Sequence, residues 1–539
     1  MRESKALNLN NYLLREKKSV FFAGVLTILS VCVQTLQATS LAALANSMLT
    51  FSLRPIISAI LIFALIYISV YLIDGLATYL QTLSIQKMNI DIQTDLLWGI
   101  ANLGYDRFHH EGTIGKFVSW LNNDIDNIDE LGFNNIFGQV TNISGIVVPL
   151  ISLFSYHWLL GSVVLGYAIL GVGLPKIVSK LIDKPTKRLT VENESFATRV
   201  EDTLNGYDTY SAYHRQQEIQ NNIANDAARL GKVNVHYQRQ LIKANGVMTY
   251  SAIIGQYLIY LMTGILILNN QLSVGSFLAT GSLAGMVFTC FSQFFNNFTQ
   301  SKTTAIIFEK YQNLSLERQA VLEFVKNSEA RLKLTKVASG ENNRWLAPTS
   351  AKIGNREKVK LSGPSGSGKS TLLRSLAALS DNYEGEIEWS PTRPDVLYLP
   401  QKPVLFNQTI RFNLSLNRHF SDDQLWQALD QVFLTDKIKK FPQGLDQVIN
   451  ISDSQFSGGE QQRLAVARGL LIQASVVLLD EATSNVDSRR AEKILATFLE
   501  SSDALVICTS HSSYPDLAGL YTQTIEIGQD NHMEEADPV

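Results

Sequence analysis

The chain has 539 residues, which is too long for one compact domain, so we expect at least two structural units. Charged residues make up only 18% of it and the mean hydropathy is slightly positive, which is unusual for a soluble protein of this size and indicates lipid-buried segments. The formal net charge of −3 gives no sign of a nucleic-acid-binding surface. Three cysteines without metal-ligand spacing predict no disulfide framework.

Three long windows almost free of charge dominate the N-terminal half. They are residues 19–86, 131–175 and 244–301, and the only charged residues inside them are Arg54 and Asp74. A membrane helix needs roughly 20 mostly apolar residues, so each window predicts a helical hairpin. The six predicted spans are residues 20–44, 56–82, 134–155, 158–178, 246–268 and 273–298, with turns at 53–55, 155–157 and 269–271.

The charge distribution around these spans predicts their orientation. The long connections, residues 84–133 and 179–243, carry many charges, whereas the hairpin tips carry almost none. Because Lys and Arg prefer the cytoplasmic side, we expect the long connections, both termini and the C-terminal half to be cytoplasmic. The apolar run after Lys18 is too long for a signal-peptide core and is interpreted as a retained first span. The chain is thus expected to be a multi-pass protein of a cell membrane, with the lipid bilayer as a partner.

The pattern changes beyond Lys302. Residues 309–330 indicate a polar helical linker, and from Arg331 short apolar strands alternate with helical segments. This alternation predicts a mainly parallel sheet in an α/β domain. We therefore expect a membrane domain at 1–310, a linker at 311–330 and an α/β domain at 331–539.

A glycine-rich loop carries the strongest chemical signal. It follows a predicted strand that ends at Leu361 and precedes a predicted helix, which is the context of a phosphate-binding loop. Its backbone N–H groups would curl around a β-phosphate at a helix N-terminus, Lys369 would contact the β- and γ-phosphates, and the Ser370 hydroxyl would bind Mg²⁺. The predicted loop consists of Gly363, Pro364, Ser365, Gly366, Ser367, Gly368, Lys369, Ser370 and Thr371.

Four further residues fit the hydrolysis of a bound triphosphate. Asp480 and Glu481 end an apolar strand, where Asp480 would hold the metal and Glu481 would polarise the attacking water as general base. His511 follows the next strand and would orient that water. Gln401 lies between the loop and these residues, where its amide could reach the metal. Acidic residues that merely cap a strand, and a structural histidine, are the simpler alternatives.

A second glycine turn, Ser457-Gly458-Gly459-Glu460, opens a predicted helix between the phosphate loop and the acidic strand end. With this turn, the C-terminal half resembles the nucleotide-binding domain of ABC transporters, whose motifs it contains in order. The resemblance identifies residues 363–371 as Walker A, Gln401 as the Q-loop, 457–463 as the signature, 476–481 as Walker B, Asp487 as the end of the D-loop and His511 as the switch histidine. It implies ATP and Mg²⁺ as cofactors.

The family resemblance also implies a partner. In ABC transporters two such domains face each other, and the signature turn of one binds the γ-phosphate held by the other, so one copy cannot complete a site. The N-terminal half resembles the membrane domain of exporter-type half-transporters, with residues 105–112 and 200–210 similar to the cytoplasmic loops that dock on the ATPase. The implied architecture is an all-α six-span membrane domain with long cytoplasmic helical extensions, followed by an α/β P-loop ATPase domain.

The expected function is ATP-driven, alternating-access export of a peptide, lipid or hydrophobic small molecule by a homodimer or a heterodimer, in a bacterial plasma membrane. An importer with the exporter fold and a regulatory ATPase that gates a partner are the alternatives. A peptide-processing exporter is disfavoured, because no room for a protease precedes residue 15.

Some positions leave questions open. No aromatic residue for adenine stacking lies near Glu341, where Trp345 could take that role, and Asn485-Val486 replaces the commoner Ala-Leu of the D-loop. Polar residues within the spans could line a cavity or join helices. They are Gln34, Gln37, Asn46, Asp74, Asn142, Gln256 and Gln293.

Overall fold

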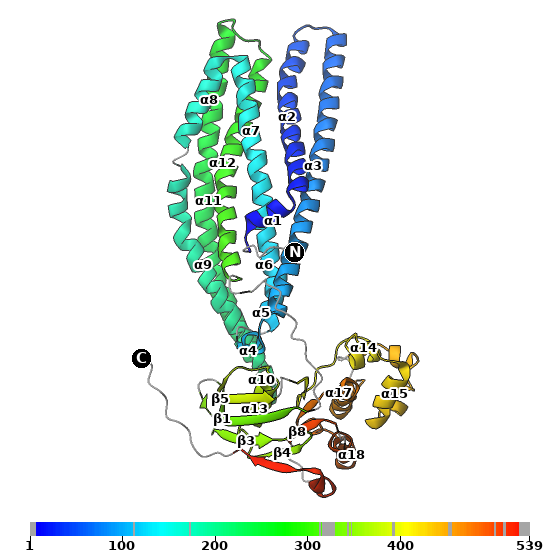
Figure 1. Ribbon diagram of the computed structural model, residues 1–539. Helices are drawn as coiled ribbons and strands as arrows, with labels where there is room; N and C mark the ends of the chain where they lie inside the picture. The colour runs from blue at the N-terminus through cyan, green and yellow to red at the C-terminus, as the bar shows by residue number, and fades with distance from the viewer. Residues whose placement is uncertain are drawn as a thin grey trace. The chain divides into compact units, whose positions relative to one another are not determined.

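The computed structural model describes residues 7–110, 114–171, 174–311, 314, 329–341, 344–345, 348–390, 394–450, 455–500, 503–509 and 514–527. The chain divides into two compact units (Figure 1). The first unit contains Met1–Ala101 and Ile114–Glu317, and the second contains Asn102–Thr113 and Arg318–Val539. Most of the predicted linker lies outside the described residues.

The first unit is helical throughout its described elements, and its long helices run side by side in Figure 1. Its elements are α1 (Leu9–Arg15), α2 (Lys17–Met48), α3 (Leu53–Ala101), α5 (Ile114–Leu121), α6 (Asn123–Ile128), the π-helix η1 (Asp129–Phe133), α7 (Asn134–Tyr156), α8 (Trp158–Gly171), α9 (Leu174–Asn205), α10 (Tyr207–Ala212), α11 (Gln216–Leu268) and α12 (Ser276–Glu309). Helix α2 packs along α3, α7 along α12, and α9 along α11.

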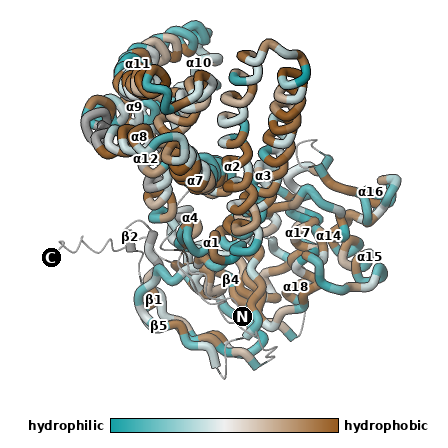
Figure 2. The backbone as a smooth tube through the Cα atoms, turned by 90° about the horizontal axis from the view of Figure 1, so that it is seen from above, coloured by the Kyte–Doolittle hydropathy of each residue, from teal (hydrophilic) through white to brown (hydrophobic). Residues whose placement is uncertain are grey.

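Within the described residues, five helical segments are long and apolar enough to cross a membrane, and Trp158–Ile169 is a shorter apolar helix. Figure 2 shows the hydrophobic residues that run along α3 and α7. These elements confirm a multi-pass membrane unit. The five long segments are Lys17–Met48, Leu53–Ala101, Ile114–Tyr156, Gln216–Leu268 and Ser276–Phe294.

One predicted turn lies elsewhere. The sequence places it at residues 53–55, but α3 already begins at Leu53 and the break occupies residues 49–52. Pro55 is accommodated in the first turn of α3, where a backbone N–H has no partner within the helix in any case. The turns near residues 157 and 270 lie where they are predicted.

Several polar residues of the spans join neighbouring helices. Ser30 Oγ on α2 donates to Asp74 Oδ1 on α3 at 3.0 Å, and Gln81 Nε2 donates to Thr27 Oγ1 at 2.7 Å. Asn46 accepts from the backbone N–H of Gly275 at 2.8 Å, just before α12 begins. Such bonds hold helices together where no water competes. For Asp74 and Asn46 the structure therefore demonstrates contacts between helices.

The described residues of the second unit form two sheets. The larger has the order β6-β7-β8-β4-β9 with every neighbouring pair parallel, and the smaller is antiparallel, with β1 paired to β2, β3 and β5. This confirms the predicted α/β domain. The strands are β1 (Arg331–Glu341), β2 (Arg344–Trp345), β3 (Thr349–Ile353), β4 (Lys358–Ser362), β5 (Tyr383–Ser390), β6 (Val396–Leu399), β7 (Val476–Asp480), β8 (Leu505–Thr509) and β9 (Gln523–Glu526).

Helices cover both faces of the parallel sheet, so its strands are apolar on each side. Along β7, Val477 and Leu479 belong to one hydrophobic cluster, while Val476 and Leu478 belong to another. The first cluster includes residues of α14, α15 and α17, and the second includes α13 and β1. The helices are α4 (Tyr105–His110), α13 (Lys369–Leu376), α14 (Ile410–Ser415), α15 (Asp422–Gln431), α16 (Thr435–Ile438), η2 (Gly444–Asp446), α17 (Gly458–Ile472), α18 (Ser488–Leu499) and η4 (Pro515–Leu520).

Helix α4 belongs to the second unit, although its sequence lies between two membrane segments. Asp106 Oδ2 accepts hydrogen bonds from Ser380 Oγ and from the backbone N–H of Asp381, both at 2.9 Å. The first predicted cytoplasmic loop is therefore attached to the α/β unit by its own side chain.

Candidate nucleotide-binding and hydrolysis site

The phosphate loop connects the end of β4 to the start of α13. Gly368 is the N-cap of α13 with φ +88°, a left-handed conformation that favours glycine. A Cβ on Gly363 would lie 2.5 Å from the carbonyl oxygen of Ile527, so a side chain there has no room. The loop thereby presents the N-terminus of α13, whose free N–H groups and positive dipole end attract anions.

Two polar side chains of this loop fit a phosphate ligand. Lys369 is largely buried, and its Nζ donates to the carbonyl oxygens of Gly363 at 2.9 Å and Pro364 at 2.8 Å. Ser367 Oγ is one of the few side-chain atoms in the described part of the chain that are buried without a hydrogen-bond partner. A buried polar atom without a partner is costly, and a phosphate oxygen would satisfy it.

The acidic strand end lies beside the phosphate loop. Asp480 is the last residue of β7, and its Oδ1 accepts from Ser370 Oγ at 2.9 Å. The neighbouring Glu481 has φ +46°, a rare conformation for a residue that is not glycine, and its Oε2 accepts from Gln401 Nε2 at 2.6 Å. The structure thus brings together Ser370, Gln401, Asp480 and Glu481, which the sequence analysis selected from three separate segments.

These donors suit magnesium. A hydroxyl, a side-chain amide oxygen and a carboxylate are hard oxygen ligands, and Mg²⁺ usually takes only a few protein oxygens together with waters and phosphate. Ser370, Gln401 and Asp480 could therefore hold Mg²⁺ beside the phosphate loop. His511 lies outside the described residues.

Sequence reasoning missed two residues that orient Asp480. Tyr398 donates its hydroxyl to Asp480 Oδ2 at 2.9 Å, and Thr509 Oγ1 donates to Asp480 Oδ1 at 3.2 Å. Burial, together with the Asp480 charge and hydrogen bond, raises the pKa of Tyr398 well above its ordinary value, so this phenol remains a donor. Both residues lie on strands that flank β7, so only the strand order, which no local sequence pattern reveals, places them beside Asp480.

The signature turn is built as a helix cap. Ser457 is the N-cap of α17, with its Oγ accepting from the backbone N–H of Glu460 at 3.4 Å, while Glu460 Oε2 accepts from the N–H of Ser457 at 2.8 Å. A Cβ on Gly459 would lie 2.3 Å from the carbonyl oxygen of Asn485, so the D-loop backbone requires glycine here. In the described residues this turn makes no hydrogen bond to the phosphate loop.

Gln462 is a further residue that sequence reasoning missed. It is almost fully buried, and its amide nitrogen donates to the carbonyl of Gln401 at 2.9 Å and to Ser484 Oγ at 3.0 Å. Its amide oxygen accepts from the backbone N–H of Asn485 at 2.8 Å. One side chain therefore joins the signature helix to the segments of Gln401 and of Asn485.

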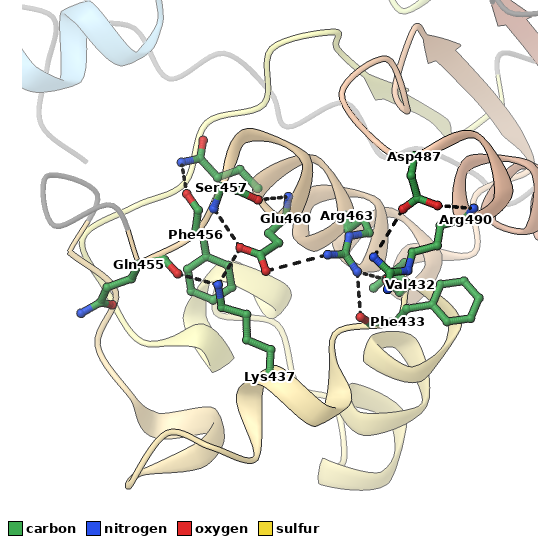
Figure 3. A network of polar contacts seen from close by, with 11 residues as sticks. Val432, Phe433, Lys437, Gln455, Phe456, Ser457, Glu460, Arg463, Asp487 and Arg490 are labelled. Atoms are coloured by element: carbon green, nitrogen blue, oxygen red, sulfur yellow. Dashed lines mark hydrogen bonds and ion pairs between the residues drawn. The ribbon is translucent and has the colours of Figure 1, made fainter.

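Asp487 is the N-cap of α18. Its Oδ1 accepts from the backbone N–H of Arg490 at 3.1 Å, and its Oδ2 pairs with Arg490 Nη1 at 3.3 Å (Figure 3). Trp345 lies on β2 opposite Gly340, but the arrangement of its side chain is not among the described features.

Comparisons with known proteins agree with this arrangement. Residues 20–291 match the ABC transporter transmembrane region family, and residues 346–484 match the ABC transporter family. An uncharacterised ABC transporter ATP-binding protein, YwjA of Bacillus subtilis, is 26% identical over 81% of this chain and 80% of its own length. The multidrug resistance-like ATP-binding protein MdlB of Buchnera aphidicola (strain APS) is 22% identical over 80% of this chain and 78% of its own length.

A solved structure shares the whole fold. A bacterial Atm1-family ABC exporter with ATP bound superposes with a TM-score of 0.78 at 21% identity, covering 95% of this chain and 94% of the exporter chain. Both regions that the sequence predicts therefore occur in one chain, as they do in that exporter.

Proposed function

Because the chain belongs to the ABC transporter family, we propose that it is an ATP-driven half-transporter that exports a peptide, a lipid or a hydrophobic small molecule. One observation carries this proposal: the phosphate loop, Gln401 and the acidic end of β7 meet at one edge of the parallel sheet. These residues would provide ATPase chemistry in the same chain as a membrane unit. The exporter fold favours outward transport.

ATP hydrolysis would use the residues of this edge in distinct roles. Lys369 and the N–H groups of the loop would bind the β- and γ-phosphates, and Glu481 would take the proton of the attacking water as general base. Ser370, Gln401 and Asp480 would hold Mg²⁺. When bound, that ion would neutralise charge that develops on the phosphates. Tyr398 and Thr509 would keep Asp480 oriented for this purpose.

We propose that the working molecule is a pair of half-transporters. The signature turn is a helix N-terminus with two glycines at its start, so its N–H groups would form a second anion site distinct from the phosphate loop. Facing a second copy, it would receive the γ-phosphate of the ATP held there. ATP would thus bind the closed pair more tightly than the open one, which shifts the equilibrium between two membrane conformations. The Lys and Arg residues of the long connections, which the hairpin tips almost lack, favour a cytoplasmic ATPase.

Transport assays in vesicles test this function. We expect purified protein reconstituted with its ATPase outside to take up a substrate in the presence of ATP, and Glu481→Gln to retain ATP binding while it loses both hydrolysis and uptake. ATPase activity without flux of any peptide, lipid or hydrophobic compound would favour a regulatory ATPase. ATP-driven efflux from these vesicles would indicate an importer.

A further inference from the structure

The signature turn of this chain contains an acidic residue where an anion is to be bound. Glu460 occupies the third position of α17, immediately after Ser457, Gly458 and Gly459. A carboxylate at a helix N-terminus stabilises the helix, but it also repels a second negative charge that approaches the same N–H groups. A triphosphate is strongly anionic. Binding of ATP by this turn therefore requires that the charge of Glu460 be offset.

Lys437 provides the opposite charge. It lies on α16, and its Nζ contacts Glu460 Oε2 at 2.6 Å and the carbonyl oxygen of Gln455 at 2.6 Å (Figure 3). The same ammonium lies 4.7 Å from the ring centroid of Phe456. Lys437 is therefore held by three contacts, two with the segment that leads into the signature turn and one with Glu460 itself. Arg463 is more distant, with 3.9 Å between its Nη2 and Glu460 Oε1.

The carboxylate stays ionised under this arrangement. Partial burial would raise the pKa of Glu460, but the hydrogen bonds from Lys437 and from the Ser457 backbone, with the Lys437 charge, outweigh burial and keep the pKa below its ordinary value. Arg463 is largely occupied elsewhere, because its guanidinium donates to the carbonyls of Val432 at 3.2 Å and Phe433 at 2.7 Å. Lys437 is thus the cation most directly engaged with Glu460.

We propose that Lys437 is a positioning residue that neutralises Glu460 and so makes the signature turn able to accept the γ-phosphate of ATP held by a second copy. This inference rests on the proposed function, because it assumes that the turn binds ATP. It assigns a role in nucleotide affinity to a residue of α16 that belongs to none of the sequence motifs.

The test separates charge compensation from structural support. Lys437→Met keeps the length of the side chain and removes the charge, so we expect KM for ATP to rise about three- to tenfold with a smaller change in kcat. Glu460→Gln removes the opposing charge but retains the oxygen that caps Ser457. We therefore expect the double variant Lys437→Met/Glu460→Gln to return KM to within about twofold of the wild-type value.

Controls make every outcome informative. Lys440→Met removes an exposed lysine three residues further along and should leave KM unchanged. If the double variant stays as impaired as Lys437→Met, Lys437 acts only as a structural tether and the inference is wrong. An unchanged KM in a folded Lys437→Met protein would also overturn it. Wild-type protein that does not hydrolyse ATP would instead reject the proposed function itself.

Discussion

Asp480 shows how one side chain is fixed by neighbours from two strands and a helix. Ser370 and Thr509 bond one carboxylate oxygen and Tyr398 bonds the other, so the side chain cannot rotate freely. A metal ligand that is already oriented loses less conformational entropy when the ion binds. At the residue scale, therefore, residues outside the motifs determine how well the motif residues are placed.

Tyr398→Phe is expected to weaken binding of Mg-ATP without unfolding the protein. The substitution removes one hydrogen bond to Asp480, a loss of about 0.5–1.5 kcal/mol, which corresponds to roughly two- to tenfold in affinity. Titration of binding at several Mg²⁺ concentrations measures the effect. Tyr383→Phe on β5 is the matched control. Equal affinities of both variants would show that Tyr398 does not orient the metal ligand.

At the scale of elements, the sequence predicted the strands and membrane helices well, because their apolar runs are long and their charges are sparse. The predicted turn at residues 53–55 was wrong, because Pro55 is as compatible with the first turn of a helix as with a loop. Strand order could not be read from the chain. Tyr398 and Thr509 therefore remained hidden, since only the order β6-β7-β8 brings them beside Asp480.

Buried side chains that link motifs were equally out of reach. Gln462 follows the signature glycines and could have been an ordinary solvent-facing helix residue. Its contacts depend on how the Gln401 segment and the D-loop fold back onto α17, which no local pattern encodes. The assignment of Glu481 as general base and of His511 as the residue that orients the water remains a prediction.

Helix α4 gives an element-scale prediction about coupling. Asp106→Ala removes the acceptor of two 2.9 Å hydrogen bonds and should loosen α4 from the segment at Ser380 and Asp381 within the second unit. Because the catalytic residues are not touched, we expect ATPase activity in detergent to stay within about twofold, while transport per ATP hydrolysed falls several-fold. Asp430→Ala, an exposed carboxylate on α15, is the control. If transport per ATP hydrolysed were unchanged, the contacts of Asp106 would not couple hydrolysis to transport.

At the scale of the whole molecule, the proposed function needs a second copy of the chain or a related half-transporter. Each chain has one phosphate loop and one signature turn, and no hydrogen bond joins the two in the described residues. We expect Glu481→Gln with Mg-ATP to form a pair that is stable in size-exclusion chromatography with light scattering, because the bound triphosphate is not consumed. Wild-type protein that hydrolyses ATP at full rate as a monomer would contradict this pairing.

The contacts of Gln462 bear on how a pair of such chains would work. This amide bonds the backbone of Gln401, beside the place where one triphosphate would bind, and the backbone of Asn485. The carbonyl of Asn485 lies against Gly459, in the turn that would receive the other triphosphate. In a pair, this buried amide would link the occupation of the first location to the conformation of the second. The rate of hydrolysis should then depend on ATP concentration in a sigmoidal manner, because the two sites would act cooperatively rather than independently.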